Sequence, residues 1–307
     1  MARGALRTLQ LAGIVLAVWL AIRVVLAAWL EVAAFDVEVG WSDAALGVSI
    51  GVVGYLCSIV MWHRLAHELG GEARLVDFSY LCVVSNLGRY VPGKIWQVLG
   101  AAALARQAGI APGVAAASSI VFVGFLVSSG AILGLAFSPW MKLPGAVWWP
   151  AACIVGATTL LLARPTLLNQ LFRRTPAGMN LASVVPIRRH LVAEQLVGNS
   201  LIWLVQGAAL FVFAGALGSP HWSEFGRLTG AYVLSYVTGL VALFAPGGLG
   251  VREGMLGYLL SSEAVGGIPA HVLSVAARIL FTAYEFTTIA LVIAIRFGVR
   301  RWSQRLS

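Results

Sequence analysis

The feature that most constrains this chain is a proline-glycine pair placed inside an otherwise apolar stretch. Pro92-Gly93 separates two apolar segments, residues 75–87 and 95–105, which are about 11–13 residues long. A helix that crosses a bilayer needs about 20 residues, so neither segment is long enough. Proline lacks the backbone N–H and glycine has little helical preference, so one helix cannot continue through the pair. The pattern predicts a re-entrant helical hairpin.

A second break of the same kind occurs at Pro246-Gly247-Gly248, inside the apolar stretch 227–261. Pro92 and Pro246 are 154 residues apart in a chain of 307, which is half its length. Irregular backbone at membrane depth is tolerated only where protein or a water-filled cavity satisfies its polar groups. We therefore expect the two tips to line a common polar site.

The composition favours a polytopic membrane protein of the all-α class. Sixty per cent of the residues are hydrophobic and only 11% are charged. The net charge of +9 does not indicate nucleic acid as a partner, because the basic residues lie between apolar spans. The three cysteines lie in apolar segments without paired or metal-ligand spacing, so buried thiols are expected and neither a metal nor a cofactor is predicted.

The hydropathy pattern predicts six full transmembrane helices plus the two re-entrant hairpins. The spans are expected at about 9–30, 44–62, 114–137, 147–163, 191–217 and 271–295, with hairpins at 76–107 and 227–261. With both termini cytoplasmic, nearly all loop arginines lie inside, and only Lys142 and Arg227 lie outside.

This arrangement divides the chain into two halves of opposite topology. Residues 1–140 contain the hairpin broken at Pro92-Gly93, and residues 141–307 contain the hairpin broken at Pro246-Gly247, together forming one membrane domain. Inverted repeats whose broken helices meet near the midplane are an architecture of transporters.

Charged residues within the apolar stretches are the candidate binding groups, because charge in hydrocarbon is costly. The candidates are Arg89, Lys94, Arg252, Glu253, Arg278 and Glu285, with Asn86, Tyr90 and Gln97 as further hydrogen-bonding groups. Guanidinium and ammonium groups at such tips could bind a phosphate. The alternative is a set of ion pairs, Arg278–Glu253 or Lys94–Glu285, that only hold helices together.

The sequence does not indicate an enzyme. It contains no Gly-rich nucleotide-binding loop and no recognisable Ser/His/Asp set. His63 and His67 have a spacing that a metal site could use, but a solvated helix end explains them better.

Two motifs carry a resemblance to a known family. Residues 88–96, Gly-Arg-Tyr-Val-Pro-Gly-Lys-Ile-Trp, and residues 246–253, Pro-Gly-Gly-Leu-Gly-Val-Arg-Glu, resemble motifs of the lysylphosphatidylglycerol synthase/flippase transmembrane region family, and Arg278 falls where that family usually carries an arginine. The resemblance implies an integral protein of the cell inner membrane. Its best-understood relatives move lipids with modified headgroups between leaflets and carry an additional aminoacyltransferase domain. Other relatives are associated with polyprenyl-phosphate sugars.

These expectations lead to one principal function and two alternatives. The principal hypothesis is a lipid flippase-like transporter for a phosphate-bearing lipid, either a modified phospholipid or a polyprenyl-phosphate-linked headgroup. Because the chain ends after the last span, lipid synthesis is not expected, and a separate aminoacyltransferase or glycosyltransferase is a candidate partner. The alternatives are a small-solute or ion-coupled secondary transporter and a non-transporting membrane partner of a cell-envelope synthesis enzyme.

Overall fold

The structure is a computed structural model that describes residues 39–90, 95–141, 188–242 and 245–306, together with a few isolated residues between 19 and 30 and between 152 and 157. This part of the chain is helical and has no β-strand; one isolated bridge joins Val265 and Ile268.

Four of the helices are long and apolar enough to cross a membrane. They are α2 (Trp41–Glu68), α5 (Pro112–Ala136), α8 (Arg189–Gly215) and α11 (Ala270–Leu306). Each contains all or nearly all of a span that the sequence predicts, and α11 continues well beyond its predicted end. The predicted spans 9–30 and 147–163 lie outside the continuously described residues. The fold is therefore that of an all-α, multi-pass membrane protein.

Each of the two proline-glycine stretches separates a pair of shorter helices. The first pair is α3 (Leu75–Asn86) and α4 (Ile95–Ala105), with the 3-10 turn η1 (Leu87–Tyr90) after α3. The second pair is α9 (Phe225–Val241) and α10 (Val251–Leu260), with the 3-10 turn η7 (Pro246–Gly248) between them. Three further 3-10 turns are η2 (Arg106–Ala108), η3 (Ser138–Trp140) and η6 (Trp222–Glu224). Residues 91–94, which include Pro92, Gly93 and Lys94, lie outside the described residues.

The second break depends on glycine conformations. Gly247, Gly248 and Gly250 have φ angles of 59°, 74° and 76°. These lie in the left-handed region, which glycine enters without the Cβ clash that other residues meet. Gly250 is the residue just before α10, so the glycines allow α10 to begin in a new direction.

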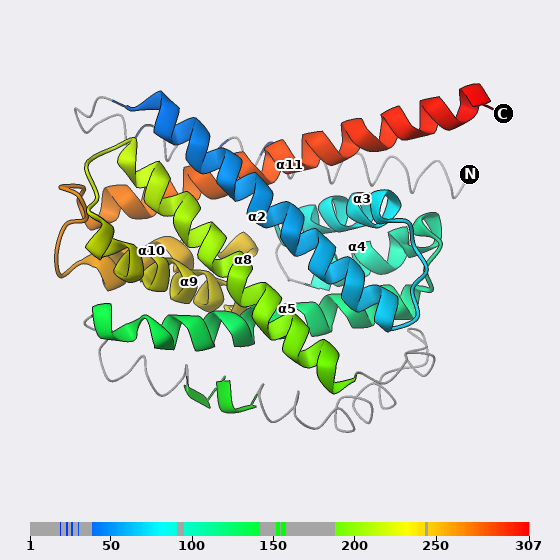
Figure 1. Cartoon of the computed structure of the whole chain (residues 1–307), viewed down its shortest axis with the longest axis horizontal. Coiled ribbons are helices and arrows are strands. Elements are labelled where there is room, and N and C mark those ends of the chain that lie inside the picture. The colour runs from blue at the N-terminus through cyan, green and yellow to red at the C-terminus, as the bar shows by residue number, and fades with distance from the viewer. Residues whose placement is uncertain are drawn as a thin grey trace.

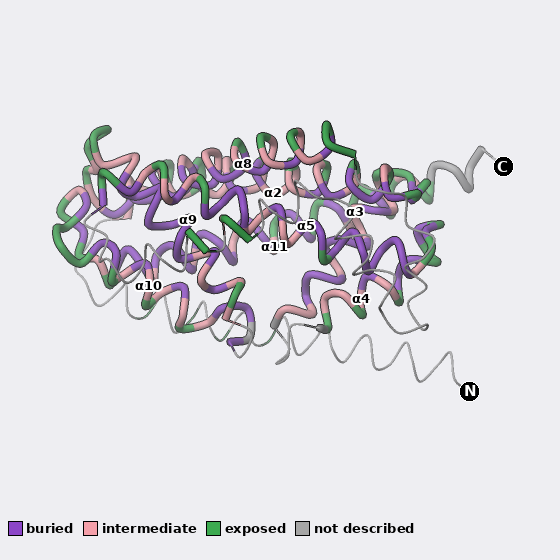
Figure 2. Tube along the Cα trace, turned by 90° about the horizontal axis from the view of Figure 1, so that it is seen from below, coloured by how far each residue is buried: buried purple, intermediate pink, exposed green. Residues whose placement is uncertain are grey.

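The two helix pairs lie at opposite ends of the long axis, with α3–α4 at one end and α9–α10 at the other (Figure 1). Helices α2 and α8 cross between them and form the most extensive helix–helix contact, while η1 contacts η7 near the centre. Seen from below, the α2–α8 pair covers one side of the body, and α4 and α10 lie on the other (Figure 2).

Glycines allow α2 to pack closely against its neighbours. A Cβ added at Gly47 would lie 2.9 Å from the Ala209 carbonyl oxygen of α8, and one added at Gly54 would lie 2.8 Å from the Gln206 amide nitrogen. A Cβ at Gly51 would overlap the ring of Tyr284 on α11. The three glycines therefore bring α2 into close contact with α8 and α11.

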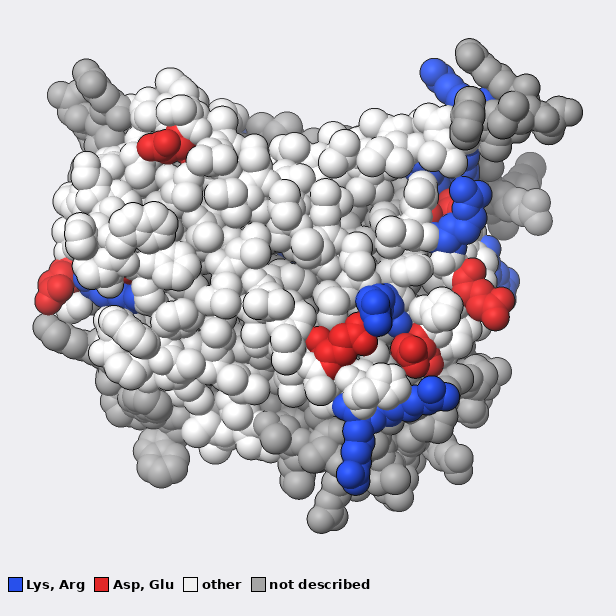
Figure 3. All heavy atoms as spheres, viewed as in Figure 1, with Lys and Arg blue, Asp and Glu red and all other residues white. Residues whose placement is uncertain are grey.

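On the face in Figure 3, charged side chains gather at the left edge and in the lower right part, and a broad area between them is uncharged. At the end that holds α3, Arg64 of α2 pairs with Glu194 of α8. Nearby, Arg296 of α11 lies 3.2 Å from the Asp77 carboxylate of α3.

Candidate functional site

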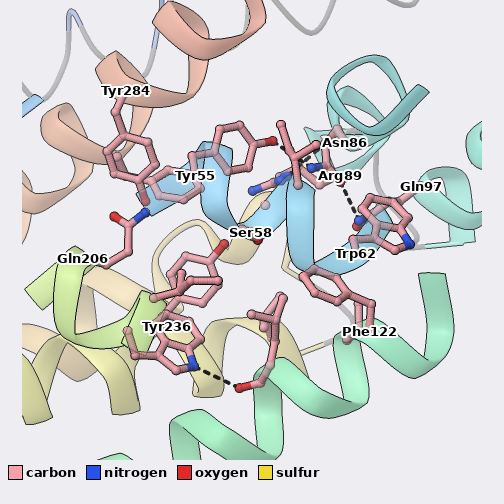
Figure 4. A pocket seen from close by; sticks show the side chains of 18 of the residues that line it. Tyr55, Ser58, Trp62, Asn86, Arg89, Gln97, Phe122, Gln206, Tyr236 and Tyr284 are labelled. Carbon is pink, nitrogen blue, oxygen red and sulfur yellow. Dashed lines mark hydrogen bonds between the residues drawn. The ribbon is translucent and has the colours of Figure 1, made fainter. Parts of the chain in front are cut away.

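A cavity of about 90 Å³ lies at the centre of the molecule, between the two helix breaks (Figure 4). It is lined by side chains of α2, α3, α4, α5, α8, α9, α10 and α11 and by residues of η1 and η7. Most of the lining is apolar or aromatic, and its described cations are Arg89 and Arg252. Arg89 precedes the first helix break, and Arg252 follows the second.

The first break contributes a hydrogen-bonded group of three side chains. Asn86, at the end of α3, is buried and donates its amide N–H to the Tyr55 hydroxyl at 2.7 Å. Gln97 of α4 donates to the Asn86 side-chain oxygen at 2.6 Å. Arg89 donates through Nε to the Asn86 backbone oxygen at 3.1 Å. Asn86 therefore fixes the positions of Arg89 and Gln97 on one wall of the cavity (Figure 4).

Arg89 is also part of a buried ion pair. Its Nη2 lies 3.4 Å from Glu285 Oε1, and the exposed fractions of the two side chains are 13% and 1%. Glu285 is in the middle of α11, where an isolated carboxylate would be very costly. The pair joins the first break to α11 and compensates the charge of Glu285.

Arg252 has a different environment. Its guanidinium carbon lies 3.7 Å from the centre of the Tyr236 ring and 4.9 Å from the centre of the Phe281 ring. The residue is 9% exposed, and its Nε and Nη1 atoms make no hydrogen bond within the described part of the chain. No described carboxylate forms an ion pair with it, whereas Arg89 and Arg278 each have one. A buried cation with free donors is suited to receive an anionic group.

Two glycines make room for the Arg252 side chain. A Cβ at Gly239 of α9 would overlap the Arg252 side chain, and one at Gly248 of η7 would lie 2.7 Å from its Nε. Gly239 and Gly248, which we call the glycine cradle, therefore leave space for the Arg252 side chain, whose guanidinium lies against the Tyr236 ring.

A second, smaller cavity of about 20 Å³ lies among α9, α10 and α11. It shares Tyr236, Arg252 and Phe281 with the central cavity, so these three residues lie at the boundary between the two. The second cavity also contains Arg278, whose Nη1 lies 3.2 Å from Glu253 Oε1. The Arg278–Glu253 ion pair that the sequence offers as an alternative is therefore present.

The structure brings some predicted site residues together and separates others. Asn86, Arg89, Gln97, Gly247 and Arg252 line the central cavity. Glu253 and Arg278 line the second cavity, and Glu285 contacts the site through Arg89. For Tyr90 and Pro246 only the backbone is described, as part of η1 and η7, and Pro92, Gly93 and Lys94 lie outside the described residues.

Four aromatic residues of the site were not among the residues predicted from the sequence. Tyr55, Tyr236, Phe281 and Tyr284 all line the central cavity, but aromatic residues in an apolar span give no sign of whether they face lipid or a cavity. Gln206 also lines the central cavity. It could have been predicted as a site residue, because a polar amide in the middle of an apolar span usually faces other helices and not lipid.

The fold and these cavities define an all-α, multi-pass membrane protein with a polar site among its helices. Comparison of the sequence with protein-family models finds no match, and comparison with curated protein sequences finds none either.

Proposed function

We propose that this protein is a lipid flippase-like transporter, which moves a phosphate-bearing lipid between the leaflets of the cell inner membrane. The observation that carries the proposal is Arg252: a buried cation at the boundary of two cavities, with free hydrogen-bond donors and no described ion-pair partner. The phosphate binds at Arg252 in this account, and the hydrocarbon tails remain in the bilayer.

The charge balance supports an anionic ligand. Within the described residues, Arg89 and Arg278 are each matched by a glutamate, and Arg252 is not. A guanidinium stacked on aromatic rings still offers its N–H groups to a phosphate, with charge-assisted hydrogen bonds of about 1.5–3 kcal/mol. A low-dielectric site strengthens such contacts further.

Transport also needs two states of similar energy, which an inverted repeat provides. Two predicted features belong to the proposal: six spans with two re-entrant hairpins, and inverted halves at 1–140 and 141–307. The helix contacts support it. In this comparison, α2 corresponds to α8, α3 to α9, α4 to α10 and α5 to α11. Each contact between two of these helices then corresponds to another observed contact; for example, α3–α4 corresponds to α9–α10, and α4–α5 to α10–α11.

Equivalent positions in the two halves also make equivalent contacts. Tyr55 and Trp203 are each the fifteenth residue of their helices, α2 and α8. Asn86 and Tyr236 are each the twelfth residue of α3 and α9. Tyr55 accepts a hydrogen bond from Asn86 at 2.7 Å, and the Trp203 and Tyr236 rings lie 4.9 Å apart. The same positions thus meet in both halves.

A leaflet-translocation assay in proteoliposomes tests the proposal. Wild type is expected to move tail-labelled phosphatidylglycerol much faster than a labelled glucosyl lipid that lacks phosphate. Arg252→Gln should abolish that acceleration, and the matched control Arg300→Gln, at a side chain that is 58% exposed, should retain it. Movement of neither lipid by the wild-type protein, or equal rates for Arg252→Gln and wild type, would overturn the proposal.

The size of the central cavity favours a second candidate, a small-solute or ion-coupled transporter. A volume of about 90 Å³ is well below the roughly 300–1,000 Å³ of typical ligand pockets and suits a group of a few atoms. In that case the proteoliposomes would take up inorganic phosphate while labelled lipids stay on their original leaflet.

A further inference from the structure

A third cavity lies among the N-terminal part of α2, the C-terminal end of α8 and α11. It has a volume of about 480 Å³, which falls within the roughly 300–1,000 Å³ of typical small-molecule sites. The lining residues are Val39, Trp41, Ala44, Ala45, Val48, Ser49, Phe213, Ala216, Leu217, Ala276, Ile279 and Ala283. We call it the α2–α8–α11 groove.

The chemistry of the groove matches hydrocarbon. None of the described lining residues is charged, and the hydroxyl of Ser49 donates to the Ala45 carbonyl oxygen at 2.8 Å. Alanines on α2 and α11 give the groove its depth, since a larger side chain at these positions would fill it. The described part of the groove therefore offers a largely apolar surface to an alkyl chain.

The position of the groove is that of a lipid tail along a membrane-spanning helix. From Trp41 to Ser49 it follows α2 for eight residues, about 12 Å at the helical rise. Trp41 is 68% exposed at one end, and tryptophan is enriched where hydrocarbon meets the headgroup region. The groove thus begins near a membrane interface and extends toward the bilayer centre.

Along α2, the Gly51–Tyr284 contact lies between the groove, which α2 lines up to Ser49, and the central cavity, which α2 lines from Tyr55 onward. Ala283 lines the groove, and the next residue, Tyr284, lines the central cavity. The Tyr284 ring packs directly on Gly51 of α2, where no Cβ would fit. Its hydroxyl lies 3.2 Å from that of Tyr232. Gly51 and Tyr284 consequently form a close contact between α2 and α11 at a position between the two cavities.

We propose that the α2–α8–α11 groove holds one hydrocarbon chain of the lipid whose phosphate binds in the central cavity, and that Gly51 and Tyr284 separate when a lipid occupies both. This inference rests on the proposed function and adds the tail-binding site to it. A lipid in transit then has its headgroup on one side of this contact and its tail on the other.

Photolabelling with phosphatidylglycerol that carries a diazirine in one acyl chain tests the inference, in vesicles of phosphatidylglycerol and phosphatidylcholine. The expected label is concentrated on Ala276, Ile279 and Ala283 of α11. Ala45→Trp, which fills the groove, should remove that label and slow translocation. Leu46→Trp is the matched control, because Leu46 is also exposed but does not line the groove.

The outcomes separate this inference from the proposed function. Label spread evenly over lipid-facing residues such as Val53 and Leu291, with translocation intact, would overturn the groove assignment alone. Absence of translocation in the wild type would overturn the proposed function and this inference with it. A photoreactive amino acid in place of Ala45 that cross-links to residues 1–38 instead of lipid would show that the chain itself fills the groove, which also overturns the inference.

Discussion

The Arg252 guanidinium lies 3.7 Å from the centre of the Tyr236 ring, and this contact holds a buried cation at the boundary between two cavities. The ring supports the guanidinium from its face and leaves the N–H groups at its edge for an anion. The proposed function depends on the position of Arg252, because the other two arginines of the site, Arg89 and Arg278, already have carboxylate partners.

Replacing Tyr236 tests the role of that ring. Tyr236→Leu removes a cation–π contact of about 0.5–2 kcal/mol and is expected to slow phosphatidylglycerol translocation several-fold. Tyr236→Phe keeps the aromatic face and should retain most of the rate. Equal rates for the two variants in proteoliposomes would mean that the ring does not position Arg252.

The glycine cradle makes a second prediction. Gly239→Ala places a Cβ where the Arg252 side chain lies, so the guanidinium must move and translocation should fall toward the Arg252→Gln level. Gly254→Ala is the control in α10, because its Cβ would meet open space. Alanine is favoured over glycine in a helix by about 1 kcal/mol, so this variant should melt at the same or a higher temperature with normal transport. Normal transport by Gly239→Ala would contradict the packing described here.

The Arg89–Glu285 pair predicts coupling between two substitutions. Glu285→Gln alone leaves Arg89 with an uncompensated charge, and breaking a buried pair in this way costs about 3–5 kcal/mol. The double variant Arg89→Gln/Glu285→Gln should unfold at a higher temperature in detergent than Glu285→Gln. Thermal unfolding of wild type, both single variants and the double variant gives the coupling free energy. Strictly additive effects would show that the two side chains do not interact.

Much of the fold can be predicted from the sequence because its signals are local. Residues 75–87 and 95–105 form helices almost as predicted, since apolar length and the proline-glycine pair determine where each begins and ends. The four long helices follow from hydropathy for the same reason. The inverted halves and the re-entrant course of the hairpins stay predictions.

The candidate site could be predicted only in part. Charge in an apolar span is a strong signal, so Arg89, Arg252 and Glu285 stand out at once. Their partners do not: that Arg89 meets Glu285 depends on how η1 packs against α11, and nothing near either residue in sequence indicates it. The aromatic rings of Tyr236 and Phe281 were not identifiable for the same reason, because only tertiary packing turns them toward a cation.

The most direct test of the central claim is selective lipid binding, measured by native mass spectrometry of the purified protein. Wild type and the surface variant Arg300→Gln are expected to retain phosphatidylglycerol in preference to a glucosyl lipid without phosphate. Arg252→Gln should lose about ten- to a hundredfold of that preference, equivalent to about 1.4–2.8 kcal/mol, and Arg252→Lys should fall between them. If Arg252→Gln keeps the full preference of the wild type, the phosphate does not bind at Arg252 and the account is wrong.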